Sequence, residues 1–133
     1  MTNTNASKNA EESRVVALSH VNVTVPADAE TAAKEFYGTV LGMRELPKPA
    51  GTRQNVGAWY ELGGVQLHLS VEENVTNALS DRHVCCVVAD VAIAERHLRD
   101  SGVAIISDAR PIAGVNRFYV RDPGGNLIEI TEA

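Results

Sequence analysis

The stretch SHVNVTVPAD (residues 19–28) decides the fold, because it returns later in the chain as RHVCCVVAD (82–90). In both copies a polar residue and a histidine open a valine-rich run that ends at an aspartate. A second pair of similar stretches, ELGGVQLHL (61–69) and RDPGGNLIEI (121–130), follows in the same order. Similarity that repeats at an offset of about sixty residues indicates two tandem modules built alike.

Each module predicts the element order βαβββ. A valine-rich strand comes first, and after Asp28 or Asp90, each a candidate helix cap, apolar residues recur at helical spacing. Three shorter strands follow, two of them joined by a Gly-Gly turn. The strands expected in the first module are 15–25, 43–46, 56–62 and 65–71. Those expected in the second are 82–88, 104–106, 116–120 and 127–131.

Length and charge limit the classes of protein that the chain can represent. Its 133 residues predict a disordered tail (1–13) and one domain (14–133) made of the modules 14–72 and 82–132. A net charge of −5 argues against a nucleic-acid partner, and the apolar runs are too short to span a membrane. Two adjacent cysteines are a poor disulfide framework, so we expect a reducing, cytoplasmic environment.

Four polar residues stand inside strands that are otherwise apolar: His20, His68, His83 and Glu129. A single strand histidine is more often a core residue than a ligand, but these four fall on equivalent strands of the repeat. A carboxylate buried alone is costly, so Glu129 needs a partner or a cation. Three imidazoles and one carboxylate suit a divalent transition metal (Zn, Ni, Fe, Co or Mn) better than calcium or magnesium.

Three motifs carry a resemblance to a known family: KEFYGTVLGM (34–43), GAWYELGGVQLHL (57–69) and FYVRDPGGNLIEI (118–130). They resemble the vicinal oxygen chelate superfamily, which comprises glyoxalase, bleomycin resistance and extradiol dioxygenase proteins. The resemblance implies an α+β fold in which the two βαβββ modules form an eight-stranded open sheet around a cleft. It also implies a metal held in that cleft, with His20, His68, His83 and Glu129 at the ligand positions.

The resemblance further implies a metal-dependent lyase or isomerase that acts on a small metabolite chelated through adjacent oxygens, in a homodimer. His68 and Glu129 are then the catalytic candidates. Glyoxalase I enzymes usually carry a carboxylate where this chain has His68, so His68 is either a fourth ligand or the base. Two alternatives stay open: an Fe(II)-dependent dioxygenase of the extradiol type, and a metal-free binding protein of the bleomycin-resistance type.

Overall fold

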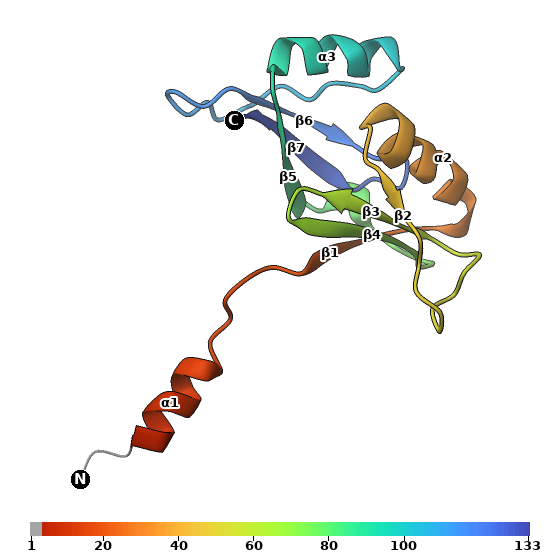
Figure 1. Ribbon diagram of the computed structural model, residues 1–133. Helices are drawn as coiled ribbons and strands as arrows, with labels where there is room; N and C mark the ends of the chain where they lie inside the picture. Colours follow the sequence, from red (N-terminus) through yellow and green to blue (C-terminus); the bar gives the residue numbers. More distant parts are fainter. Residues whose placement is uncertain (1–3) are drawn as a thin grey trace.

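Two small β-sheets, one from each module, organise the computed structural model, which describes residues 4–133 (Figure 1). In the first sheet the strand order is β1-β4-β3-β2, and in the second it is β5-β7-β6. The strands are β1 (His20–Val25), β2 (Glu45–Leu46), β3 (Ala58–Leu62), β4 (Val65–Val71), β5 (His83–Val88), β6 (Arg117–Arg121) and β7 (Leu127–Glu132). In each sheet the module's opening strand lies at the edge, parallel to its neighbour.

Helices of both modules share one hydrophobic core with the two sheets. The α-helices are α1 (Thr4–Glu12), α2 (Glu30–Glu35) and α3 (Val91–Asp100), and short helical turns are η1 (Ala27–Ala29), η2 (Phe36–Val40, a π-helix) and η3 (Asn77–Leu79). Asp90 caps α3 by accepting the Ile93 N–H at 3.0 Å, as expected. Asp28 makes no such cap, because η1 begins after Pro26 and carries Asp28 within its own turn. No helix among residues 4–133 has the length and apolar character needed to span a bilayer.

The α+β class is confirmed, but the eight-stranded sheet is not: the described residues form seven strands. The expected strand at 104–106 is reduced to one bridge, in which Ile106 and Tyr119 exchange both backbone hydrogen bonds. Beyond Ile106 the chain enters a loop that contains Pro111 and Gly114 (φ +79°), two residues that interrupt a ladder. One pair of residues therefore takes the place of the eighth strand.

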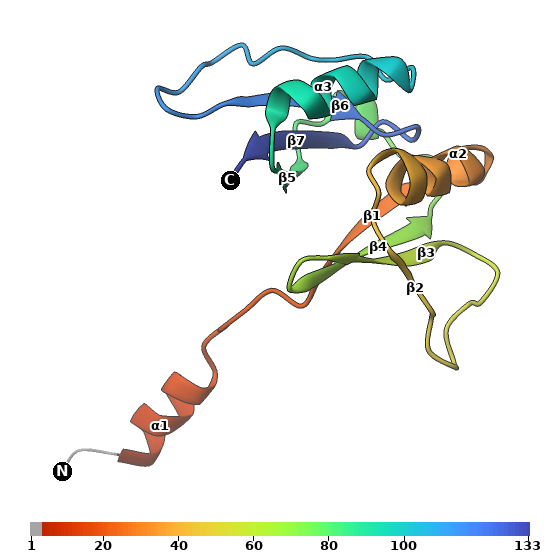
Figure 2. The ribbon, with the colours of Figure 1, turned by 45° about the horizontal axis from the view of Figure 1, so that its top comes forward.

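The first strand begins at His20, five residues later than the sequence predicts. Its partner β4 starts only after the Gly63-Gly64 turn, and the ladder opens where the Gln66 N–H donates to the Ser19 carbonyl oxygen. Residues 15–18 consequently have no strand beside them. Together with α1 they stand away from the rest of the chain in both views (Figures 1 and 2). Residues 4–12 of the predicted tail thus form a helix, and residues 1–3 lie outside the described part.

Buried polar contacts hold the two modules together. The hydroxyl of the fully buried Tyr37 in η2 donates to Asp122 Oδ2 at 2.6 Å, in the turn between β6 and β7. In the same turn Gly124 packs so closely on Val25 that a Cβ at this position would come within 2.3 Å of a Val25 methyl group. The two modules are therefore in direct contact where η2 and the end of β1 meet the turn between β6 and β7.

Candidate functional site

His20 and His68 form the first of two pairs among the predicted site residues. They lie on the neighbouring strands β1 and β4, and their rings stack with centroids 4.1 Å apart and 16° between planes. Trp59 covers the other face of His68 at 3.8 Å and 4°, from the directly opposed position on β3. His68 is thus the middle ring of three.

The environment of His68 favours its neutral form. Only 8% of the residue is exposed, and Nε2 lies 2.9 Å from Gln66 Oε1. Burial lowers the pKa of His68 below its ordinary value, and the neighbouring His20 and Lys48 lower it further. A neutral imidazole can accept a proton or bind a metal, so both roles left open by the sequence are chemically available.

His83 and Glu129 form the second pair, on β5 and β7 of the other sheet. His83 Nε2 lies 3.2 Å from Glu129 Oε1, and only 8% of Glu129 is exposed. Cys85, which is directly opposite Glu129 in the ladder, donates its thiol to Oε2 at 3.3 Å. Burial and this carboxylate raise the pKa of Cys85 to about 11, so its thiol stays protonated and unreactive at neutral pH.

Arg117 on β6 supplies a positive charge beside Glu129. Its Nη1 lies 3.7 Å from Glu129 Oε2, while its Nε donates to Asp108 Oδ2 at 2.8 Å. The hydrogen bond from Arg117 lowers the pKa of Asp108, so this loop residue is an ionised anchor for the guanidinium. The Tyr119 ring meets His83 edge-on, with centroids 5.8 Å apart. The buried carboxylate therefore has several polar partners, as its position on an apolar strand requires.

The structure does not bring the two pairs together within one chain. Over residues 4–133, no three His, Cys, Asp or Glu side chains are grouped closely enough to hold a metal ion. One pair belongs to the sheet of the first module and the other to the sheet of the second. Each pair is thus half of the predicted ligand set.

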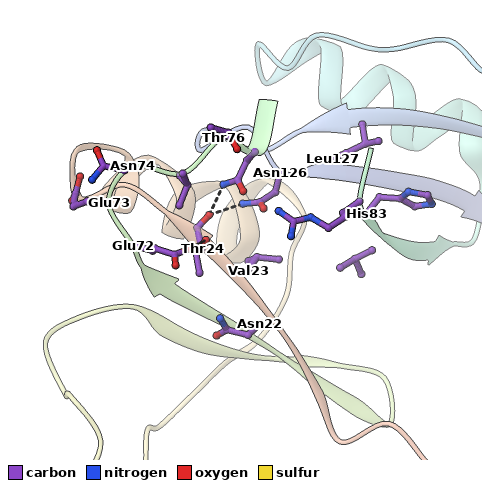
Figure 3. Close-up of a pocket in the computed structure, with 14 residues that line it drawn as sticks. Asn22, Val23, Thr24, Glu72, Glu73, Asn74, Thr76, His83, Asn126 and Leu127 are labelled. Carbon is purple, nitrogen blue, oxygen red and sulfur yellow. Dashed lines mark hydrogen bonds between the residues drawn. The ribbon is translucent and has the colours of Figure 1, made fainter. Parts of the chain in front are cut away.

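His83 also borders a hollow of about 510 Å³ between the modules, lined on one side by the edge strand β1 (Figure 3). At its inner end the side-chain amides of Asn77 and Asn126 donate to the Thr24 carbonyl oxygen, at 2.7 and 2.9 Å. The Asn126 amide thereby ties the second module to the end of β1, and the Asn77 amide ties the segment between the modules to the same point. His83 itself extends from the opposite side, away from these bonds (Figure 3).

The comparison with protein families accounts for this fold. Residues 17–130 match the model of the Glyoxalase/Bleomycin resistance protein/Dioxygenase superfamily. The chain belongs to this superfamily. Divalent metals are typical of glyoxalase-superfamily members, and both pairs consist of side chains that bind such ions. A comparison with curated protein sequences gave no significant match.

Solved structures of the superfamily resemble the chain over almost its whole length. A putative glyoxalase family protein from Bacillus anthracis is 34% identical, with a TM-score of 0.80 over 90% of this chain and 96% of that one. A lactoylglutathione lyase from Agrobacterium tumefaciens is 21% identical (TM-score 0.68, 90% and 95% covered). A fosfomycin resistance protein from Listeria monocytogenes is 13% identical (TM-score 0.73, 89% and 92% covered). The last two similarities establish the shared fold alone.

Sequence reasoning did not predict the contacts of two residues of the candidate site. The contact of Trp59 with His68 depends on the register between β3 and β4, which the Gly63-Gly64 turn sets. Arg117 pairs with Asp108 and Glu129, two contacts that the sequence does not predict. The sequence does hold one signal that could have placed Arg117 near the site. Residues alternate between the two faces of β6, so Arg117 and Tyr119 lie on the same face of that strand.

Proposed function

We propose that the protein is a metal-dependent enzyme with lyase or isomerase chemistry of the glyoxalase type. Its substrate would be a small metabolite that binds the metal through two adjacent oxygens. His20, His68, His83 and Glu129 would hold the metal, with His68 as either the fourth ligand or the base. The active form would be a homodimer in which His20 and His68 of one chain meet the partner's His83 and Glu129.

The observation that carries this proposal is the arrangement of the four residues as two pairs, or half-sites, each of which would supply half of the metal site. His83 and Glu129 are in contact at 3.2 Å, and His20 and His68 are stacked, but each pair lies on a separate sheet. Most oligomers of identical chains are symmetric, and a two-fold axis that brings one half-site onto the other produces two complete sites. A dimer thus unites the residues that one chain holds apart.

The donor set fits a divalent transition metal. One carboxylate and three neutral imidazoles leave a 2+ ion with a net positive charge, which attracts an anionic substrate oxygen. Such an ion acts as a Lewis acid that stabilises negative charge developing on the substrate. The protein's own side chains contribute in two ways. Asp108 fixes Arg117, whose guanidinium lies beside the Glu129 carboxylate, and burial favours the neutral form of His68, which can take a proton.

Binding of one metal by both His20 and His68 would require one ring of the stack to turn. In stacked rings the nitrogen lone pairs lie in nearly parallel planes, and here the ring centroids are 4.1 Å apart. Two rings that hold the same ion would need lone pairs that converge. Because Trp59, the only tryptophan in the chain, stacks on His68, its fluorescence reports this change.

Metal analysis of protein purified without an affinity tag tests the proposal. We expect about one metal ion per chain in the wild-type protein, loss of that metal in a His83→Ala, Glu129→Ala double variant, and a change in Trp59 emission when the metal is removed by a chelator. His97→Ala is the control, since His97 Nε2 contacts the Val40 carbonyl oxygen outside both half-sites. That variant should keep its metal.

The same measurement separates the alternatives. Nickel, zinc or manganese supports the glyoxalase type of chemistry, whereas Fe(II) supports oxygenation at a site with two histidines and one carboxylate. A folded wild-type protein that binds none of these metals when they are added would contradict the proposal. It would favour a binding protein that holds its ligand without a metal.

A further inference from the structure

The segment between α1 and β1 exposes apolar side chains to an unusual degree. Val15 and Val16 are each 93% exposed and Leu18 is 59% exposed. In an extended chain Val15 and Ala17 point to one side and Val16 and Leu18 to the other. A strand that is apolar on both faces is found in proteins where both faces are covered. Residues 15–18, which we call the arm, thus have the sequence of a buried segment but are left exposed by the described part of their own chain.

We propose that the arm docks on a second copy of the chain and fastens the dimer. This inference rests on the shared-site dimer proposed above, since the arm leads directly into His20. If His20 binds a metal together with the partner's His83, the partner's surface begins within a few ångströms of His20. At about 3.3 Å per residue, Leu18 lies within about 7 Å of His20 and Val15 within about 17 Å. A partner chain that shares a metal with His20 would therefore lie within reach of the whole arm.

A partly apolar hollow lies beside the second half-site. His83 borders this hollow of about 400 Å³, whose lining combines Ile106, Tyr119 and Leu127 with charged residues of both signs, among them Asp108 and Arg117. Ile106 is 40% exposed, and two further aliphatic residues of the following loop, Ile112 and Val115, are also exposed. Single exposed apolar residues are ordinary, but Ile106 and Leu127 both border the hollow that His83 also lines. The partner's hollow beside His83 is the docking site to which we assign the arm.

Substitution in the arm provides the first test. In a Val16→Asp, Leu18→Asp double variant we expect the dimer to dissociate at least about 100-fold more readily, because two apolar side chains lose their burial and two carboxylates take their place. Leu79→Asp with Ile93→Asp is the matched control, since these aliphatic residues are similarly exposed (87% and 59%) but lie outside the arm. Analytical ultracentrifugation measures the dissociation constants, and the control should dimerise like the wild type.

Proteolysis of the unaltered chain provides the second test. Trypsin cleaves after basic residues, and Arg14 is exposed immediately before the arm. We expect cleavage between Arg14 and Val15 to slow at least about tenfold between concentrations below and above the dissociation constant of the dimer. Cleavage after Lys8, in the exposed helix α1, is the internal reference. Protection that is the same at all concentrations would mean that the arm folds onto its own chain, and would overturn the inference.

The outcomes also distinguish this inference from the proposed function. If the arm variant dimerises as tightly as the wild type, the arm does not fasten the dimer, although the shared metal site stands. If the wild-type protein is a monomer at every concentration and binds its metal as a monomer, the shared site and the docked arm are both wrong. The substitutions in the arm variant and in the control lie on the surface. Equal thermal unfolding of the two diluted proteins shows that the fold is unaffected.

Discussion

At the scale of single residues, the bond between Tyr37 and Asp122 joins the two modules in their core. Tyr37 is fully buried and Asp122 is 4% exposed, so the removal of the hydroxyl leaves a carboxylate with one donor fewer and no water to replace it. We expect Tyr37→Phe to lower the free energy of unfolding by about 2 kcal/mol, as for hydrogen bonds to charged groups. Urea denaturation at pH 7 measures the loss.

Tyr60→Phe is the control for this prediction. Tyr60 is also a buried tyrosine (2% exposed), but its hydroxyl makes only a long bond of 3.4 Å to the Lys34 carbonyl oxygen. The loss should be below about 0.5 kcal/mol, because a neutral bond of this length contributes little. If Tyr37→Phe and Tyr60→Phe lower the free energy of unfolding equally, the Tyr37–Asp122 bond contributes no more to stability than the long bond of Tyr60.

At the scale of elements, Glu30 ties the start of α2 to the start of β3. Its carboxylate accepts the Gly57 N–H at 2.7 Å and pairs with Lys34 Nζ at 3.3 Å. The backbone bond from Gly57, more than any other contact, lowers the pKa of Glu30 below its ordinary value of 4.5. The folded pKa lies below the unfolded one, so this stabilisation is complete above the ordinary pKa and is lost as the pH falls through the folded pKa.

A Glu30→Gln variant should therefore show a pH-dependent defect. We expect its free energy of unfolding to be about 1 kcal/mol below that of the wild type at pH 7, with a difference that shrinks as the pH is lowered toward 3. Glu95→Gln removes an exposed pair with Arg99 on α3 and should cost less than about 0.5 kcal/mol throughout. A Glu30→Gln defect that does not change with pH would contradict the argument.

The repeat predicted the elements well because each is defined by its own residues. Strand β4 occupies the predicted 65–71, where a Gly-Gly turn and strict alternation mark its start and its buried face. The errors occur where a strand depends on a distant partner. Residues 15–18 have strand sequence but lie beyond the end of β4, and residues 104–106 retain one bridge to Tyr119. A strand extends only as far as its partner strand runs beside it. The length of that partner is set elsewhere in the chain, so the local sequence pattern does not reveal it.

At the scale of the whole molecule, the sequence identified the candidate ligands but not their distribution. Alternation placed His68 and Glu129 on sheet faces, and the repeat made His20 and His83 equivalent. Whether equivalent strands face one another depends on how the modules pack, and contacts such as Tyr37 with Asp122 decide it. The Tyr37–Asp122 contact joins residues 85 positions apart, and no local periodicity predicts it.

A mixing experiment tests whether two chains share each site. A His20→Ala, His68→Ala variant and a His83→Ala, Glu129→Ala variant should each bind no metal, because every site in either dimer lacks two ligands. In a mixed dimer one site receives four intact ligands and the other none. Random exchange makes roughly half of the dimers mixed, so the mixture should regain roughly a quarter of the wild-type metal. Native mass spectrometry counts both the mixed dimers and their metal. Mixed dimers without metal would place the ligands of each site on a single chain and remove the reason for the dimer.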